Sequence, residues 1–198
     1  PKIEDVIAFD TGPGNMIIDA AAAIVTRGEQ SYDVDGRLAA VCSPNEERVN
    51  AAMQDSYFQR VPPKSTGREY WGVQYVQKAA LTYGEAELPS IVADMTEITA
   101  QSIHDAYERF ILPKHDLRGI YVSGGGARNP VLMRRLERLF APIRVGTSDD
   151  LGLPVDAKEA IAFAILANET VCGTPANVPS ATGARGHRVL GSIVPGTI

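Results

Sequence analysis

The sequence is poor in cysteine, in long apolar runs and in positive charge. Its two cysteines, Cys42 and Cys172, lie far apart and belong to no Cys-x-x-Cys or Cys/His pattern. The cysteines therefore indicate neither a disulfide framework nor a zinc site, and they favour a reducing, cytoplasmic compartment. No run reaches the roughly 18 apolar residues that a membrane-spanning helix needs. With 19 Lys and Arg against 24 Asp and Glu, the net charge is −5, which argues against a nucleic-acid-binding surface.

The rest of the composition is that of a globular protein. Hydrophobic residues make up 44% and charged residues 22% of the 198 positions, which argues against disordered and fibrous classes. The length suits one compact domain or two small ones. The chain does not begin with Met, and its first apolar run, Val6–Phe9, starts within a few residues of the end. We therefore expect a piece of a longer protein.

The two ends of the chain share a strand-loop-helix pattern. Short apolar runs predict strands at 6–9, 119–122 and 143–145, and periodic or alanine-rich runs predict helices at 16–25, 130–140 and 156–171. Gly173 would end the last helix. A β-loop-α unit near the start and β-loop-α-β-loop-α near the end predict an α/β fold with a parallel sheet component.

The segment between these ends, from about residue 43 to 112, is expected to be helical. Capping boxes at Ser43–Glu46 and Thr66–Glu69 begin the first two helices, and Pro113 ends the third. The expected helices cover 44–55, 69–83 and 90–112.

The loop Asp10–Asn15 joins the first strand to the first helix. Gly12 and Gly14 let its backbone turn sharply and approach a ligand, and the amides at the helix N-terminus favour an anion such as phosphate. Asp10 follows the strand directly, and a carboxylate there can hold a metal, accept a proton or cap the turn. An Asx-turn with an ordinary helix cap explains the same residues equally well.

The loop Ser123–Asn129 repeats this arrangement with three consecutive glycines, Gly124, Gly125 and Gly126. Their bare backbone offers a flat face to an adenine ring or a ribose, whereas a flexible turn with Asn129 as the N-cap is the plain alternative. The spacing matches neither a Walker phosphate loop nor a dinucleotide fingerprint.

Two further carboxylates have competing interpretations. Glu159 lies in the first turn of an apolar helix, where it either complements the helix dipole or faces a cleft and binds a sugar hydroxyl or a water. Asp19 is isolated in an apolar helix, where an unpartnered buried carboxylate is costly. It either bonds the amides of the glycine loop or lies near a metal-bound phosphate, and we favour support of the loop.

Five segments, in order and across nearly the whole chain, resemble signatures of the anhydro-N-acetylmuramic acid kinase family: FDTGPGN at 9–15, PKSTGRE at 63–69, GGGAxNP at 124–130, EAMAFA at 159–164 and PSVTGA at 179–184. The first and last together are specific, whereas a glycine triplet alone is not. Departures are mild, with Ile161 where Met is usual and Ala176 where Gly is expected.

The resemblance implies membership of the actin/hexokinase/Hsp70 (ribonuclease H-like) superfamily, in which two α/β lobes clamp a nucleotide. Residues 1–198 would form one C-terminal lobe, a mixed sheet flanked by helices with the helical segment 43–112 inserted. Such kinases hydrolyse the 1,6-anhydro bond of anhydro-N-acetylmuramic acid and phosphorylate O6 with ATP. The product, N-acetylmuramic acid 6-phosphate, belongs to cell-wall recycling.

By this resemblance, Asp10 is the general base, and Glu159 contacts the sugar or a water. The phosphates would lie by Thr11, Gly12, Pro13, Gly14 and Asn15, and the adenosine by Gly124, Gly125, Gly126 and Asn129. Mg²⁺ is implied because phosphoryl transfer needs charge neutralisation. The family also suggests a homodimer.

The family's first phosphate loop, GTSxDGxD, and its NxGGIxN segment have no match in this sequence. The chain thus resembles only the C-terminal part of such a kinase, and we expect little or no turnover without the missing N-terminal lobe. The alternatives are a nucleotide-binding module without chemistry of its own and a lobe of another superfamily ATPase.

Overall fold

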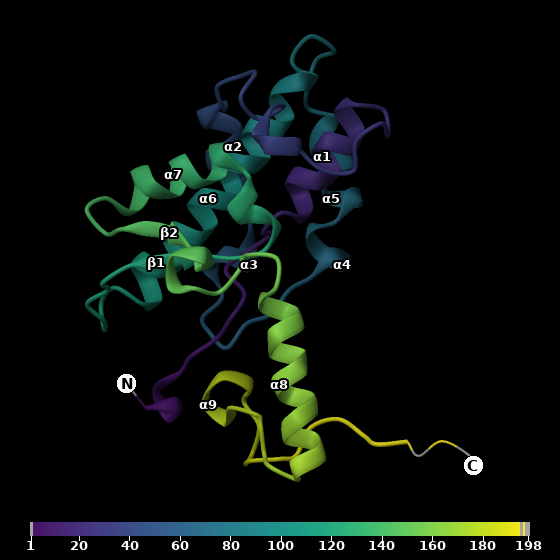
Figure 1. The fold of residues 1–198 in the computed structure, drawn as a ribbon. Helices are drawn as coiled ribbons and strands as arrows, with labels where there is room; N and C mark the ends of the chain where they lie inside the picture. Colours follow the sequence, from purple (N-terminus) through teal and green to yellow (C-terminus); the bar gives the residue numbers. More distant parts are fainter. Residues whose placement is uncertain (1, 195, 197–198) are drawn as a thin grey trace. The chain divides into compact units, whose positions relative to one another are not determined.

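The computed structural model describes residues 2–194 and 196, which form two compact units. The larger unit covers Asp10–Val155, and the smaller one combines the segments before and after it. Figure 1 follows the chain from the N-terminus in purple to the C-terminus in yellow.

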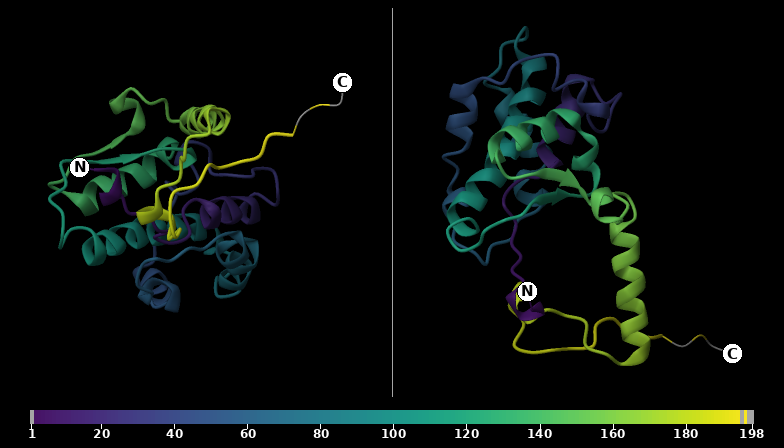
Figure 2. Two further views of the ribbon diagram at one scale, coloured as in Figure 1. Left: turned by 90° about the horizontal axis from the view of Figure 1, so that it is seen from below. Right: turned by 60° about the vertical axis from the view of Figure 1, so that its left-hand side comes forward.

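The larger unit is mostly helical and contains a small parallel sheet. The sheet has the order β1-β2, with Ile120 opposite Val145 and Val122 opposite Thr147. Helices α1, α2 and α7 all pack on the long helix α6 (Figures 1 and 2). In chain order the elements are α1 (Met16–Val25), η2 (Val34–Gly36), α2 (Glu46–Ala52), α3 (Ser56–Gln59), α4 (Arg68–Trp71), α5 (Val73–Ala80), η3 (Leu88–Ser90), α6 (Ile91–Phe110), β1 (Ile120–Val122), η4 (Gly125–Arg128), α7 (Pro130–Phe140), β2 (Val145–Thr147) and η5 (Ser148–Leu151).

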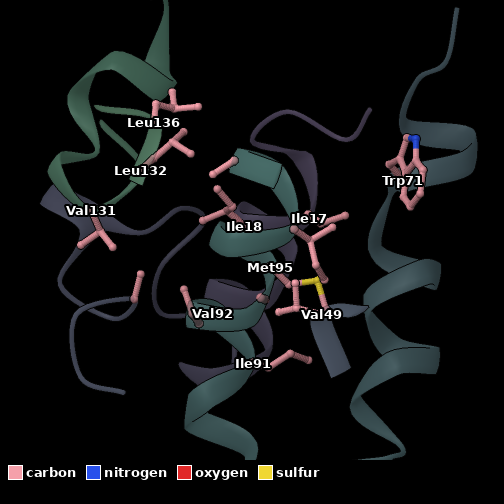
Figure 3. Packing of buried hydrophobic residues seen from close by; sticks show 14 of the residues in the cluster. Ile17, Ile18, Val49, Trp71, Ile91, Val92, Met95, Val131, Leu132 and Leu136 are labelled. Carbon is pink, nitrogen blue, oxygen red and sulfur yellow. The ribbon is translucent and has the colours of Figure 1, made fainter. Parts of the chain in front are cut away.

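The hydrophobic core lies around α6. Residues 91–100 of this helix are all buried, because neighbouring helices cover it on several sides. Full burial of a Val, Ile, Leu or Met side chain contributes about 1.5–3 kcal/mol to the free energy of unfolding. Figure 3 shows the side chains that meet in this core, among them Ile17 and Ile18 of α1, Val92 and Met95 of α6, and Leu132 and Leu136 of α7.

Two buried carboxylates fasten α6 to its neighbours. Asp94 accepts hydrogen bonds from the Asn45 N–H at 2.7 Å and from the Tyr83 hydroxyl at 2.5 Å. Glu97 is 4% exposed and lies 3.2 Å from Nε of Arg135 on α7, which also donates to the Ala93 carbonyl. Because each charge has partners, the buried polar face of α6 links helices instead of weakening the core.

Most of the predicted helices are confirmed. The predicted helix 16–25 is α1, the predicted helix 90–112 is α6, and Asn129 caps α7 as expected. Two helix starts were predicted wrongly. Asn45, not Ser43, caps α2, because its side chain accepts the Arg48 N–H at 3.0 Å. The capping box at Thr66 does not form, and the helix it should begin is split into α4 and α5 by extended backbone at Gly72.

The strand predictions are correct in part. Residues 119–122 give β1, but the next strand begins at Val145, because the Ile143 N–H closes a turn onto the Phe140 carbonyl at 2.7 Å. The described residues form a purely parallel pair where a mixed sheet was expected. Val6–Phe9 lies outside the helices and strands. A strand requires a neighbour to satisfy its backbone groups, and the described residues supply none there.

The smaller unit contains η1 (Ile3–Asp5), α8 (Lys158–Cys172) and α9 (Pro179–Thr182), of which α9 packs on η1. Helix α8 ends at Gly173, whose φ of +69° confirms the predicted glycine stop. Within the described residues, no helix is long and apolar enough to cross a membrane.

Candidate active site

Asp10 is exposed to solvent, yet the surrounding chain fixes it at three atoms. Its N–H donates to the Lys64 carbonyl at 3.0 Å, and its carbonyl accepts the Tyr57 hydroxyl at 2.8 Å. Its carboxylate Oδ2 accepts the backbone N–H of Thr66 at 2.9 Å. The predicted strand end does not hold Asp10. Instead, the segment around residues 64–66 orients an accessible carboxylate.

The loop after Asp10 is packed against α6. A Cβ at Gly12 would lie 2.9 Å from both a ring carbon of Phe58 and the hydroxyl of Ser102, so only glycine fits there. The Gly14 carbonyl accepts the Thr99 hydroxyl at 2.8 Å. Asn15 then precedes α1 without capping it through its side chain. The loop backbone is therefore held by contacts from distant residues, and it leads directly into a helix N-terminus that favours anions.

The second glycine loop adjoins the first. A Cβ at Gly125 would lie 3.2 Å from Nδ2 of Asn15, and one at Gly126 would lie 3.0 Å from its Oδ1. The structure thus brings together the two loops that the sequence placed about 110 residues apart. The Oδ1 of Asn129 accepts the N–H groups of Val131 and Leu132 at 3.0 and 3.1 Å. Asn129 therefore caps α7 as predicted, and it also lines the cavity described next.

A cavity of about 610 Å³ lies between these loops, within the range typical of small-molecule sites. An adjoining cavity of about 630 Å³ shares Asp19, Ser31 and Arg68 with it. The first cavity is lined by Asn15, Ile18, Asp19, Ser31, Tyr32, Asp33, Val34, Asp35, Arg68, Gly125, Arg128 and Asn129.

Asp19 lines both cavities. Burial raises the pKa of its carboxyl above the usual range, the Arg68 guanidinium opposes this shift, and the negative charge of Asp33 adds to it. The prediction that Asp19 supports the glycine loop was wrong. In the part of the chain that the structure describes, its carboxylate makes no hydrogen bond to a loop amide. Its isolation in an apolar helix was the signal that it faces a cavity.

The comparisons agree on one family. A family model described as anhydro-N-acetylmuramic acid kinase matches residues 1–196. The chain belongs to this family. A protein named anhydro-N-acetylmuramic acid kinase from Caldanaerobacter subterraneus subsp. tengcongensis is 44% identical over 97% of this chain and 49% of its own length. Relatives of the same name from Salinibacter ruber and Clostridioides difficile are 43% and 42% identical, each over 98% of this chain and 49% or 50% of their own length. The chain therefore spans about half the length of these relatives.

The segments 9–15 and 63–69 are in contact at Asp10, and the sequence analysis did not predict this contact. The PKSTGRE segment was explained as a capping box, whereas its Thr66 N–H binds the Asp10 carboxylate and its Lys64 carbonyl binds the Asp10 N–H. Tyr57 lies outside every motif and was not predicted to have any role. Backbone donors and acceptors leave no trace in residue types, so the sequence carried no signal for this pairing.

The remaining predicted site residues are divided between the two units. Glu159 is exposed in the first turn of α8, in the smaller unit, and its role stays a prediction. Thr11 is half-buried and Pro13 is buried within the first loop. Among the described residues, no group of three or more His, Cys, Asp and Glu side chains is placed to hold a metal ion.

Proposed function

We propose that this chain is the C-terminal lobe of an ATP-dependent kinase for anhydro-N-acetylmuramic acid, with an actin/hexokinase/Hsp70-like fold over residues 1–198. The completed enzyme would open the 1,6-anhydro bond and phosphorylate O6, giving N-acetylmuramic acid 6-phosphate for cell-wall recycling. The observation that carries the proposal is the exposed, three-point-held Asp10, followed by a loop that adjoins a second glycine loop and a ligand-sized cavity.

In this proposal Asp10 is the general base. Thr66 occupies Oδ2, which leaves the other carboxylate oxygen to accept a proton from water. The water oxygen bonds to the anomeric carbon as the bond from that carbon to O6 breaks. The electron pair of that bond stays on O6, which then bonds to the γ-phosphorus of ATP as ADP leaves. Orientation of the base is the main contribution of the chain to this step.

The nucleotide would lie along the two loops. Backbone groups of Thr11–Asn15 would face the phosphates, and Gly124–Gly126 with Nδ2 of Asn129 would face the adenosine in the 610 Å³ cavity. Mg²⁺ would be held mainly by phosphate oxygens and water, as is usual where it accompanies a nucleotide. The chemistry that it would supply there is neutralisation of the phosphate charge.

Three further features complete the proposal. Glu159 would contact the sugar or a water, an N-terminal lobe would supply the other phosphate loop, and the enzyme would work in the cytoplasm, where ATP is available. A homodimer is also proposed, on the family resemblance alone. Without its N-terminal lobe, the chain would show little or no turnover.

The test is Asp10→Asn in this chain completed with the N-terminal half that its relatives have. Loss of a general base lowers kcat by roughly 10²–10⁴-fold. ATP affinity, measured by calorimetry, should stay within a factor of about three, because the substitution removes one charge and leaves the loops intact. Turnover equal to the parent's would remove Asp10 as the base. Tight ATP binding with no turnover in the unsubstituted protein would favour a nucleotide-binding module.

A further inference from the structure

We propose that Tyr57 is a positioning residue for Asp10 and that Lys64 anchors it, so that the two together fix the backbone from which the carboxylate projects. This inference rests on the proposed function, in which Asp10 is the general base. Neither residue reaches a substrate in this proposal, and both act through Asp10.

The hydrogen bonds show that two residues grip the Asp10 backbone from either side. Tyr57 donates its hydroxyl to the Asp10 carbonyl at 2.8 Å, and the Lys64 carbonyl accepts the Asp10 N–H at 3.0 Å. With both backbone groups held, the carboxylate Oδ2 of Asp10 lies where it accepts a hydrogen bond from the Thr66 N–H at 2.9 Å. Rotation of the Asp10 backbone would break at least one of these bonds.

Tyr57 is held rigidly enough to act as a fixed point. It is 3% exposed, and its ring meets Phe58 and Trp71 edge-on, with centroids 6.2 and 5.9 Å apart. Burial, helped by the nearby Asp10 charge, raises the pKa of the phenol. The hydroxyl therefore stays protonated and keeps its role as donor.

Lys64 packs on the same ring. The residue is 5% exposed, and its Nζ lies 4.8 Å from the centroid of Tyr57 and 5.7 Å from that of Phe110. Both distances fall within the range of about 6 Å in which a cation is attracted to an aromatic face. The two residues that hold the Asp10 backbone are thus packed on each other, and a shift of either one would move the other.

The chain supplies a matched control in Tyr70. Its hydroxyl donates to Oδ1 of Asp55 at 2.7 Å and has no bond to Asp10. Its ring belongs to the same aromatic cluster, 6.0 Å from Tyr57 and 4.8 Å from Trp71. Tyr70→Phe and Tyr57→Phe therefore remove the same atom from the same cluster, and only one of them frees the Asp10 backbone.

The activity test uses the chain completed with an N-terminal half. We expect Tyr57→Phe to lower kcat about tenfold, with the KM for ATP unchanged, whereas Tyr70→Phe keeps the parent's kcat. Asp10→Asn is measured alongside. If Asp10→Asn retains full turnover, the proposed function fails. If Asp10→Asn abolishes turnover and Tyr57→Phe matches the parent, the positioning role alone is overturned.

A second measurement needs only the present chain and no turnover. Amide hydrogen exchange at Asp10 and Thr66, followed by NMR, should be roughly tenfold faster in Tyr57→Phe than in the parent, and unchanged in Tyr70→Phe. Equal rates in both variants would overturn the proposal. If Tyr57→Phe does not fold, Lys64→Met replaces it. Exchange should then speed up in Lys64→Met and return to the parent's rate in Lys64→Arg, and a Lys64→Met variant with the parent's rates would contradict the anchoring role.

Discussion

The two glycine loops look alike in the sequence but are held in different ways. The loop Asp10–Asn15 is fixed by residues far away in the chain, including Tyr57 and Thr99. The loop Ser123–Asn129 has a local support at its own end, where the Asn129 side chain caps the helix that follows. A local pattern can therefore mark where a ligand approaches, while the source of its rigidity depends on what packs behind it.

The largest effect is expected where the supports of both loops are joined. Helix α6 packs against the first loop, and α7 follows the second. An ion pair between Glu97 of α6 and Arg135 of α7, at 3.2 Å, joins these two helices. Glu97→Ala leaves a buried arginine without its partner, which costs about 3–5 kcal/mol in the free energy of unfolding. Urea denaturation would measure the loss. Arg144→Ala, which removes the exposed pair with Asp150, should change stability by less than about 1 kcal/mol, and equal losses would contradict the prediction.

The next largest effect compares how tightly the two loops are packed. Gly12→Ala places a Cβ 2.9 Å from Phe58 and Ser102, whereas Gly125→Ala meets only the end of the Asn15 side chain at 3.2 Å. Overpacking at Gly12 should cost about 1–3 kcal/mol, and the Gly125 variant less than half of that, because the Asn15 amide can move aside. Thermal unfolding of the two variants measures the difference. An equal loss of stability would show that both loops are packed with the same tightness.

A smaller pair of changes tests the hydrogen bonds themselves. Thr99→Val removes the bond to the Gly14 carbonyl and should cost about 1 kcal/mol, felt mainly as faster amide exchange in the first loop. Asn129→Ala removes the cap of α7 and should cost about 0.5–2 kcal/mol, felt mainly as fraying of that helix. Residue-resolved exchange would locate each effect, and an effect of Thr99→Val confined to α7 would contradict the distinction between the loops.

The smallest effect concerns Asp19, which lines the cavity between the loops. Burial raises its pKa in the folded chain, so the folded state binds the proton more tightly and stability falls as pH rises above the ordinary value of 3.8. Asp19→Asn should therefore be more stable than the parent at neutral pH. The advantage should shrink as pH falls and vanish below 3.8, where both states are protonated. Unfolding curves at several pH values check this, and a constant difference would refute it.

The sequence predicted the helices that have a strong internal pattern. Alanine-rich α1, the long apolar-spaced α6 and amphipathic α7 were placed correctly because periodicity and caps are local properties. Val6–Phe9 was predicted as a strand because it is apolar and short, but a strand also requires a partner. Thr66 was assigned to a cap because its residue type suits one, whereas its N–H is used by Asp10.

The sequence by itself determined the family, the candidate base Asp10 and the two loops with their glycines, because these depend on which residue types occur and in what order. Only the tertiary structure decided what holds Asp10, since the Lys64 carbonyl and Thr66 N–H are backbone groups that every residue type possesses. It also decided that Asn15 lies against Gly125 and Gly126, because folding around α6 sets which distant segments meet.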